Sequence, residues 1–537
     1  MQLRKSIKHK TIFIMRYILS AILLLASLTA CQQEKEYKFP RTAAEDTEKI
    51  MSDKYWSYWT PEAQAKIDAD IEKNRKADAQ FTVGDIAPDT KVTVEQISSD
   101  FGFGASSFNW DQLGKKEYND IYKNLFGTLF NRATVAFYWK EFELEQGKKR
   151  FFAEECDSEE WWSNCKEPHM QPHWRRPPTE PVIKWCEEHD VTVHGHPLVW
   201  GHMSIQSPDW LRDGVPAHEL AALDSLDKFR LNRDGKEKNH PAYERMSSDE
   251  IAAIVPEYTK LLNKRVFGNM EEIMKQYDGR VDSWDVVNES YTDHREKTLI
   301  PGSKLCKAYR YGLMPGDYVY RSFDLAEKLN KGNALLNINE TQSDSKYENA
   351  DIYSDEIKTL LERGAKIDMI GIQIHLMRKY RNAELVAQGK DIWSPQRAYY
   401  VLDKLAETNL PMCMSEITIT SPNSDYRGEM IQSIIAVNLY RLWFSYPNMT
   451  AITWWNLVDD CGYKGEPTIS GLFTRDMKPK LAYHALYNLI HKEWRTNETL
   501  TPDGEGNIAW RGFTGKYRIT WTDSKGEKRE AIYELKK

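Results

Sequence analysis

The sequence predicts an α/β protein organised as a (β/α)8 TIM barrel with loop insertions and a small β-layer formed by the N- and C-terminal segments. Three observations support this class. Short apolar runs alternate with longer amphipathic stretches between residues 101 and 495, as in repeated βα units. Two of these runs end abruptly in a carboxylate. Short strand patterns separated by turn residues occupy both ends of the 537-residue chain, which is long enough for one large domain with additions.

Residues 1–30 have the features of a signal peptide. Five basic residues and no acidic ones occur there, and an apolar run extends from Tyr17 to Leu28. The small residues before Cys31 resemble a bacterial lipobox, which implies lipidation of Cys31. A transmembrane helix is the alternative, but the apolar run is short for a bilayer span. We expect an exported bacterial lipoprotein of the outer membrane, with either the cell surface or the periplasmic face as its location.

The composition restricts the partners. The chain has 73 basic and 80 acidic residues, a formal net charge of −7, and loss of the five basic residues of the signal peptide would leave 68 against 80, near −12. This balance argues against nucleic acid and against anionic membrane surfaces, so we expect membrane contact only through the lipid at Cys31. We expect a monomer.

Six cysteines remain once Cys31 is lipidated, in a compartment where disulfides form. Cys156 and Cys165 flank an acidic, Trp-rich segment, and we expect these two to pair. Cys186 and Cys413 fit small buried residues of a helix and a strand. The chain contains no CxxC motif or Cys/His cluster, so no metal and no cofactor are expected.

The two ends of the chain should meet in the β-layer. Residues 31–78 are predicted as a lipidated tether followed by a helix, which begins at Pro61 after the N-cap Thr60 and extends to about Lys76. Residues 79–100 and 496–537 form the predicted N- and C-terminal β segments, and a separate sugar-binding module in the tail is the alternative. The strand patterns span Ala79–Val83, Lys91–Ile97, Ile508–Arg511, Tyr517–Thr522 and Glu530–Tyr533.

Residues 101–495 form the predicted barrel. A helix capped by Ser248 should extend to about Tyr277 before the fourth strand, with a kink at Pro256. Two insertions, about Ala153–Pro178 and Arg212–Met246, follow barrel strands, and they either extend or wall off the cleft or decorate the surface. The eight strands are expected at Phe101–Ala105, Thr134–Phe137, Val191–Gly195, Arg280–Val287, Ala334–Ile338, Met369–Ile374, Met412–Ser415 and Ala451–Trp455.

Four motifs carry the functional signal. They are Trp284-Asp285-Val286-Val287-Asn288-Glu289, Ser415-Glu416, Gly195-His196-Pro197-Leu198-Val199-Trp200 and Gly371-Ile372-Gln373-Ile374-His375. Together, and in the order in which they follow one another along the chain, they resemble glycoside hydrolase family 10, the retaining endo-1,4-β-xylanases. The resemblance extends from about Phe101 to about Trp494 and implies that residues 101–495 are a catalytic barrel.

The resemblance implies that Glu289, at the end of the fourth strand, is the acid/base and that Glu416, at the end of the seventh, is the nucleophile. A retaining glycosidase holds such carboxyls roughly 5–5.5 Å apart. At that distance the charge of Glu416 raises the pKa of Glu289, which can then donate a proton near neutral pH. Asn288 should donate a hydrogen bond to the sugar 2-hydroxyl or to the nucleophile, and His375 should contact the nucleophile. The other substrate-binding residues that the resemblance implies are His196, Trp200, Gln373, Trp455 and Tyr463.

The sequence departs from the family in three places. Residues 134–140 read Thr-Val-Ala-Phe-Tyr-Trp-Lys and lack the Glu-Asn pair that binds the −2 sugar, so Tyr138 or an insertion is expected to replace its contacts. Thr418 replaces an Asp, which removes a carboxylate from His375 and favours the neutral imidazole. Tyr463 stands where the family has a second cleft Trp. These changes spare the catalytic pair and predict an altered sugar preference.

The sequence thus predicts a lipid-anchored retaining endo-1,4-β-xylanase that hydrolyses xylan or decorated xylo-oligosaccharides through a glycosyl-enzyme intermediate. Two alternatives are a non-catalytic glycan-binding lipoprotein on the same scaffold and a retaining hydrolase of another β-linked glycan. The tolerated substituents and endo or exo action are left open by the sequence.

Overall fold

The computed structural model describes residues 37–87, 89–202, 206–231, 246–308, 312–341 and 347–537. The chain divides into two compact units, Met1–Lys38 and Phe39–Lys537, and the second contains all the elements discussed below. The predicted signal peptide and Cys31 lie outside the described residues, as does most of the second half of the Arg212–Met246 insertion. Within the described part, no helix is both long and apolar enough to cross a membrane.

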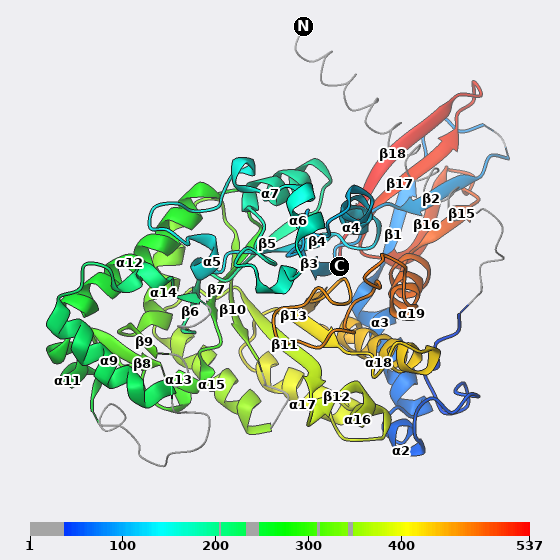
Figure 1. Ribbon diagram of the computed structural model, residues 1–537. Coiled ribbons are helices and arrows are strands. Elements are labelled where there is room, and N and C mark those ends of the chain that lie inside the picture. The colour runs from blue at the N-terminus through cyan, green and yellow to red at the C-terminus, as the bar shows by residue number, and fades with distance from the viewer. Residues whose placement is uncertain (1–36, 88, 203–205, 232–245, 309–311, 342–346) are drawn as a thin grey trace, which may run out of the picture. The chain divides into compact units, whose positions relative to one another are not determined.

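Eight parallel strands close into a barrel, as predicted. Each barrel strand pairs with the next barrel strand along the chain (Figure 1). The barrel closes where β14 pairs with β3. The predicted strands are all present, but β10, β11 and β13 continue two to four residues beyond their predicted ends. The barrel strands are β3 (Gly102–Ser106), β4 (Arg132–Ala136), β5 (Thr192–His196), β7 (Ser283–Asn288), β10 (Leu335–Glu340), β11 (Met369–Arg378), β13 (Met412–Ile419) and β14 (Met449–Trp454).

A helix follows every barrel strand, which is the repeated unit of this architecture. One of them, α18, has an almost wholly buried surface because further elements cover it on the outside. The eight helices are α4 (Lys116–Thr128), α7 (Thr179–Glu188), α12 (Pro256–Gln276), α14 (Tyr318–Leu329), α15 (Tyr347–Glu362), α17 (Pro395–Ala406), α18 (Tyr426–Ser445) and α19 (Leu481–Tyr487).

The predicted tether is shorter than expected. Residues 39–59 belong to the folded unit, because the buried carboxylate of Asp46 accepts hydrogen bonds from Ile50 N, Met51 N and Trp56 Nε1, each at 2.9 Å. Helix α3 (Pro61–Arg75) follows, with Thr60 as its N-cap as predicted, and lies on α18. Its polar residues did not reveal this packing because the contact is partly a hydrogen bond between Gln64 and Asn438.

The single helix predicted before the fourth strand is two helices. Ser247, and not Ser248, caps α11 (Ser248–Ile254) in a capping box with Glu250. The chain leaves helical geometry at Val255, and Pro256 occupies the first position of α12. Proline lacks the N–H that a continuous helix would need but fits the first turn, so it starts a new helix where a kink was predicted.

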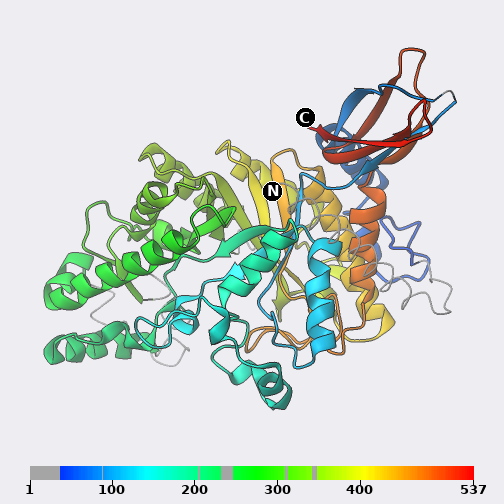
Figure 2. The ribbon, with the colours of Figure 1, turned by 90° about the horizontal axis from the view of Figure 1, so that it is seen from above.

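The β-layer contains strands from both ends of the chain, as predicted, and so the tail is not a separate module. Figure 2 shows these strands, blue and red, side by side. Their shared core includes Val92, Val94, Trp510 and Ile519. One sheet pairs β1 (Lys76–Thr82) with β16 (Asn507–Phe513), and the other has the order β15 (Asn497–Leu500), β2 (Val92–Gln96), β17 (Gly515–Thr522) and β18 (Lys528–Leu535). Strand β15 was not predicted.

The predicted disulfide between Cys156 and Cys165 is absent, and both residues are free cysteines. Helix α6 (Glu159–Asn164) separates them. A helix of this length rises about 9 Å, whereas the Cα atoms of a disulfide lie at most about 7 Å apart. The helix therefore disfavours a bond between the two cysteines that flank it.

Further elements complete the unit, most of them short. Several lie in the loops that follow the barrel strands and were not predicted. They are α2 (Asp53–Trp56), α5 (Trp139–Phe142), η1 (Ala153–Glu155), η2 (Pro168–Met170), β6 (Val199–Trp200), η3 (Asp209–Arg212), α9 (Ala217–Leu231), α13 (Tyr291–Arg295), β8 (Leu305–Ala308), β9 (Gly312–Pro315), β12 (Arg381–Asn382), α16 (Ala383–Ala387) and η5 (Asn488–Glu493).

Candidate active site

A cavity of about 560 Å³ is lined by residues at the C-terminal ends of the barrel strands and in the loops that follow them. This is the face that carries the active site in barrel enzymes. Every substrate-binding and catalytic residue predicted from the sequence lines this one cavity: His196, Trp200, Asn288, Glu289, Gln373, His375, Glu416, Trp455 and Tyr463.

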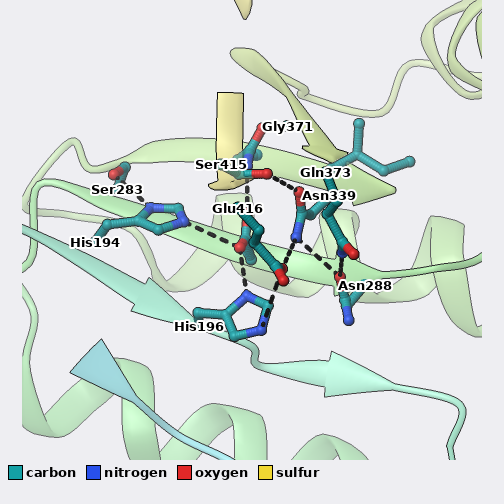
Figure 3. A network of polar contacts seen from close by, with 12 residues as sticks. His194, His196, Ser283, Asn288, Asn339, Gly371, Gln373, Ser415 and Glu416 are labelled. Atoms are coloured by element: carbon teal, nitrogen blue, oxygen red, sulfur yellow. Dashed lines mark hydrogen bonds and ion pairs between the residues drawn. The ribbon is translucent and has the colours of Figure 1, made fainter. Parts of the chain in front are cut away.

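Glu416 is held from three sides. It lies within β13, whose residues are all buried, and its side chain is 7% exposed. Asn339 Nδ2 donates a hydrogen bond of 2.9 Å to Oε1, and His196 Nε2 lies 3.7 Å from the same oxygen (Figure 3). On the other side His375 Nε2 lies 3.5 Å from Oε2. The hydrogen bond and the two imidazoles together fix the position of the Glu416 carboxyl group.

Glu289 occupies a strained position directly after β7. Its φ of 57° lies in the left-handed region, which costs a non-glycine residue about 1–3 kcal/mol. The backbone N–H of Glu289 donates to the carbonyl of Asn339 at 2.8 Å, which holds this conformation. The strand therefore ends in a sharp turn at the residue whose carboxyl lines the cavity.

Two buried carboxyls lie behind this turn. Burial, together with the charge of Glu289, raises the pKa of Glu340 well above its ordinary value, and its oxygens accept bonds from Tyr291 N and Thr341 N. Burial raises the pKa of Glu356 to about 8, although Ser290 donates a hydrogen bond to it. Both groups favour the uncharged form, which avoids further negative charge beside Glu289.

A chain of buried polar groups supports His196 from below. Asp285 Oδ2 lies 2.6 Å from His196 Nδ1 and 3.0 Å from His194 Nε2, and His194 Nδ1 lies 2.8 Å from Ser283 Oγ. Burial would lower the pKa of His196, but the hydrogen bond to Asp285 and the charges of Glu416, Asp285 and Glu289 raise it overall. For the carboxyl of Asp285, burial acts in the opposite direction and would raise the pKa. The imidazoles of His194 and His196 nevertheless bring this pKa far below its ordinary range. Asp285 therefore stays ionised and favours a protonated His196.

The hydrogen bond to Glu416 comes from Asn339, whereas the sequence suggested Asn288 as a donor. Asn288 Oδ1 instead accepts from Asn339 Nδ2 at 3.0 Å and from Gln373 Nε2 at 3.1 Å. With its oxygen occupied on the protein side, the amide nitrogen of Asn288 is the group oriented for a ligand. Gly371 makes room for this network, because a Cβ there would lie 2.3 Å from Asn339 Oδ1.

His375 is placed as predicted next to Glu416 and has a neutral neighbour. Thr418 Oγ1 lies 3.0 Å from His375 Nδ1, and Gln373 Oε1 lies 3.3 Å from Nε2. The nearest side-chain partner of His375 Nδ1 is thus a hydroxyl, at the position where the resemblance implied an Asp.

Aromatic rings form another part of the lining. Phe108 and Trp455 meet edge to face at 5.0 Å, and Trp455 meets His196 at 5.4 Å. Tyr138 packs against Phe108, and its hydroxyl lies 3.1 Å from His196 Nε2. Flat apolar surfaces beside polar groups suit a ring with hydroxyls at its rim.

The first insertion enters the cavity, so the surface-decoration alternative is wrong for it. Arg175 and Arg176 line the cavity and are 2% and 5% exposed. The Arg176 guanidinium stacks over the Tyr138 ring at 3.7 Å, beside the stretch that lacks the family's Glu-Asn pair.

Sequence reasoning missed Asn339, Asp285 as a partner of His196, and the two arginines. Asn339 lies one residue beyond the predicted end of its strand, and Asp285 stood within a quoted motif without a role. Arg175 and Arg176 belong to no recognised motif. Their only sequence signal was their position in an insertion that follows a barrel strand.

The arrangement provides a buried carboxyl group, a second carboxyl-bearing residue in the same cavity, amide donors and aromatic surfaces. That set suits attack on an electrophilic sugar carbon with proton transfer to the departing oxygen. Among the described residues, no group of three or more His, Cys, Asp or Glu side chains could hold a metal ion.

Comparisons with known proteins find relatives named endo-1,4-beta-xylanase, among others. Endo-1,4-beta-xylanase B of Thermotoga neapolitana is 21% identical over 417 residues, which are 75% of this chain and 92% of that protein. Endo-1,4-beta-xylanase A of Halalkalibacterium halodurans is 24% identical over 203 residues, 38% of this chain and 42% of that protein. Anti-sigma-I factor RsgI6 of Acetivibrio thermocellus is 22% identical over 469 residues, 86% of this chain and 47% of that protein. The chain thus spans less than half the length of the last two relatives.

Among solved structures, xylanase 10B from Thermotoga maritima is similar with a TM-score of 0.47 and 19% identity, covering 73% of this chain and 96% of that one. The model of Glycosyl hydrolase family 10 matches residues 95–489, which include every barrel strand and every residue of the cavity named above. Because that match covers more than half of the 537 residues, the chain belongs to Glycosyl hydrolase family 10.

Proposed function

We propose that this protein is a retaining endo-1,4-β-xylanase. The observation that carries the proposal is that Glu289 and Glu416, which follow β7 and lie in β13, line one cavity. In that cavity Glu416 accepts a hydrogen bond from Asn339 and lies between the imidazoles of His196 and His375. The substrate class comes from the relatives named endo-1,4-beta-xylanase. The roles follow from general glycosidase chemistry.

In the first step, a carboxylate oxygen of Glu416 attacks the anomeric carbon, and Glu289 gives its proton to the departing glycosidic oxygen. The bond from Asn339 keeps Glu416 oriented until the covalent bond forms. The amide nitrogen of Asn288 donates to the sugar 2-hydroxyl, a bond that strengthens in the transition state. The first product leaves as an alcohol, and the second sugar stays on Glu416.

In the second step, Glu289 removes a proton from water, whose oxygen attacks the anomeric carbon and releases Glu416. Loss of the negative charge of Glu416 in the intermediate makes Glu289 more acidic and so able to act as the base. Two inversions at one carbon give net retention of configuration.

A reducing-sugar assay on a panel of β-linked polysaccharides tests the proposal. We expect hydrolysis of β-1,4-xylan, an initial product of β configuration by NMR, and a loss of about 10⁴-fold or more in kcat for Glu416→Ala. A 2-deoxy-2-fluoro xyloside with a good leaving group should lose that group and add the mass of its fluoroxylosyl unit to the wild type and not to the variant.

Other outcomes point to the alternatives. Binding of xylan without release of reducing ends would favour the non-catalytic glycan-binding protein. Hydrolysis of a different polymer, with xylan untouched, would favour the other β-glycan hydrolase. An α-configured first product would refute the double displacement.

For its location, we propose a lipid anchor at Cys31 and display on the outer membrane, supported by the basic and apolar segment that precedes this residue. Expression in a Gram-negative host should place the wild type in the membrane fraction and Cys31→Ser in the soluble fraction. Protease treatment of intact cells separates the surface from the periplasmic face, and equal partition of the two proteins would contradict the anchor.

A further inference from the structure

The insertion between β4 and α7 forms a fixed wall of the cavity. The side chain of Gln112 holds the backbone of this insertion at two points. Its Nε2 donates a hydrogen bond to His173 O at 2.8 Å, and its Oε1 accepts one from Arg175 N at 2.7 Å. Trp174 Nε1 donates to Gly462 O at 3.0 Å, which ties the segment to the loop after β14. We call residues 173–176 the arginine wall. Its anchors hold Arg175 in the left-handed region, at φ 62°, and direct two consecutive arginines to the cavity.

The two arginines differ in how their guanidinium groups are used. Arg175 Nη1 donates to Asn456 Oδ1 at 2.8 Å and to Cys461 O at 2.9 Å, so this group is occupied by the protein. Arg176 donates one hydrogen bond within the described structure, from Nη1 to the carbonyl of Arg175. Its flat face lies on Tyr138, with Tyr463 at 5.7 Å, which leaves the edge of the guanidinium as its remaining hydrogen-bonding surface.

The charge around Arg176 is incompletely balanced. The nearest carboxyl is that of Glu141, 3.7 Å from Nε. Burial raises the pKa of Glu141 despite the neighbouring Arg176, which weakens this pair. Along the described cavity lining, Arg175, Arg176, Arg378, Arg381 and Lys464 outnumber Glu289, Glu416 and Glu466. This excess of positive charge occurs in a chain whose net charge is −7.

A neutral sugar polymer does not require such a surface, whereas a carboxylate does. The edge of a guanidinium matches the two oxygens of a carboxylate, and the pairing is stronger where water is excluded. Tyr138 links this position to the reacting centre, because its ring supports Arg176 and its hydroxyl lies 3.1 Å from His196, the neighbour of Glu416.

We propose that Arg176 binds the carboxylate of a uronic acid substituent on the glycan, so that the enzyme selects acidic, glucuronic acid-decorated xylan. The inference rests on the proposed function for its backbone polymer, and its own content is the recognition of the carboxylate by Arg176.

Three xylo-oligosaccharides test it: one unsubstituted, one with a glucuronic acid side chain, and the same compound with the carboxyl reduced to an alcohol. The wild type should prefer the acid over its reduced analogue about tenfold or more in kcat/KM. Arg176→Gln should remove that preference, so that kcat/KM falls about tenfold or more further for the acid than for the unsubstituted compound, while Arg176→Lys should retain part of it. Lys166→Gln, an exposed change of equal charge in the same insertion, should behave like the wild type.

The outcomes separate the two proposals. Hydrolysis of the unsubstituted compound tests the xylanase assignment alone. If it is not hydrolysed, calorimetric binding of the acid and of the reduced analogue to wild type and Arg176→Gln decides the inference. Equal affinity or rate for these two ligands in the wild type overturns it, even if Arg176→Gln does not fold. An equal loss on all three compounds in Arg176→Gln, or a preference that persists there, also overturns it.

Discussion

The two sides of the cavity are built differently. The side under Glu416, which we call the floor, consists of strand-end residues whose side chains contact Glu416, among them Asn339 and His196. The arginine wall is a loop held by Gln112, Trp174 and Arg175. Rigid strands suit groups that must meet a reacting atom, whereas a loop can change without disturbing them. Substitutions in the floor should therefore lower kcat, and substitutions in the wall should alter affinity and substrate choice.

Asn339→Ala should give the largest effect. It removes the hydrogen bond to Glu416 and the support of Asn288, and we expect kcat on xylo-oligosaccharides to fall about 10²–10³-fold with a smaller change in KM. Asn164→Ala, on exposed α6, is the control. A loss confined to KM would contradict the division between floor and wall.

Gly371→Ala should destabilise the floor by about 1–3 kcal/mol, because its Cβ would lie 2.3 Å from Asn339 Oδ1. Gly268→Ala is the matched control, since no atom lies within 4 Å of its Cβ in the interior of α12. There alanine should raise the free energy of unfolding by about 1 kcal/mol. Chemical denaturation measures both, and equal shifts would show that the floor is loosely packed.

Asp285→Asn should change how stability depends on pH. The pKa of Asp285 is lowered in the folded state, so its contribution is present above about pH 4, the ordinary carboxyl range, and is lost as pH falls. The pKa of His196 is raised, so its contribution is present below about pH 6.5 and is lost at higher pH. Wild-type stability should therefore peak on the acidic side of neutral.

The variant should lose on the order of 2 kcal/mol at pH 6 and progressively less as the pH falls below about 4, and the pKa of His196 should fall in an NMR titration. An unchanged His196 titration would show that Asp285 is not its main partner.

Gln112→Ala should give the smallest effect. Loss of its two bonds to the wall should raise KM a few-fold and lower stability by about 1–2 kcal/mol, with kcat nearly unchanged. Steady-state kinetics on the glucuronic acid-substituted compound would reveal it. A drop in kcat as large as that of Asn339→Ala would mean that the wall takes part in the chemistry.

The sequence predicted the barrel and most of the floor because apolar strands and four motifs mark them. It ended β10 at Ile338, β11 at Ile374 and β13 at Ser415, where polar residues interrupt the apolar runs. Backbone pairing continues past those points, since these polar side chains are satisfied by one another inside the barrel. For that reason the sequence did not predict that Asn339 belongs to the site.

The wall could not be predicted. Its position depends on a left-handed residue, Arg175, that is not a glycine, and on bonds to Gln112 and Gly462, which lie far away in the sequence. The same applies to the cysteines, because spacing along the chain did not reveal the helix between them.

The β-layer has a consequence for biogenesis. Strand β2 receives its partners β15 and β17 only from residues 497–522, about four hundred positions later. Pairing across so long a separation is slow, and until it occurs β2 leaves unpaired backbone edges open to other chains. A nascent polypeptide halted before those residues would contain all the barrel strands and still be a target for chaperones and proteases. The β-layer can therefore form only when synthesis is nearly finished.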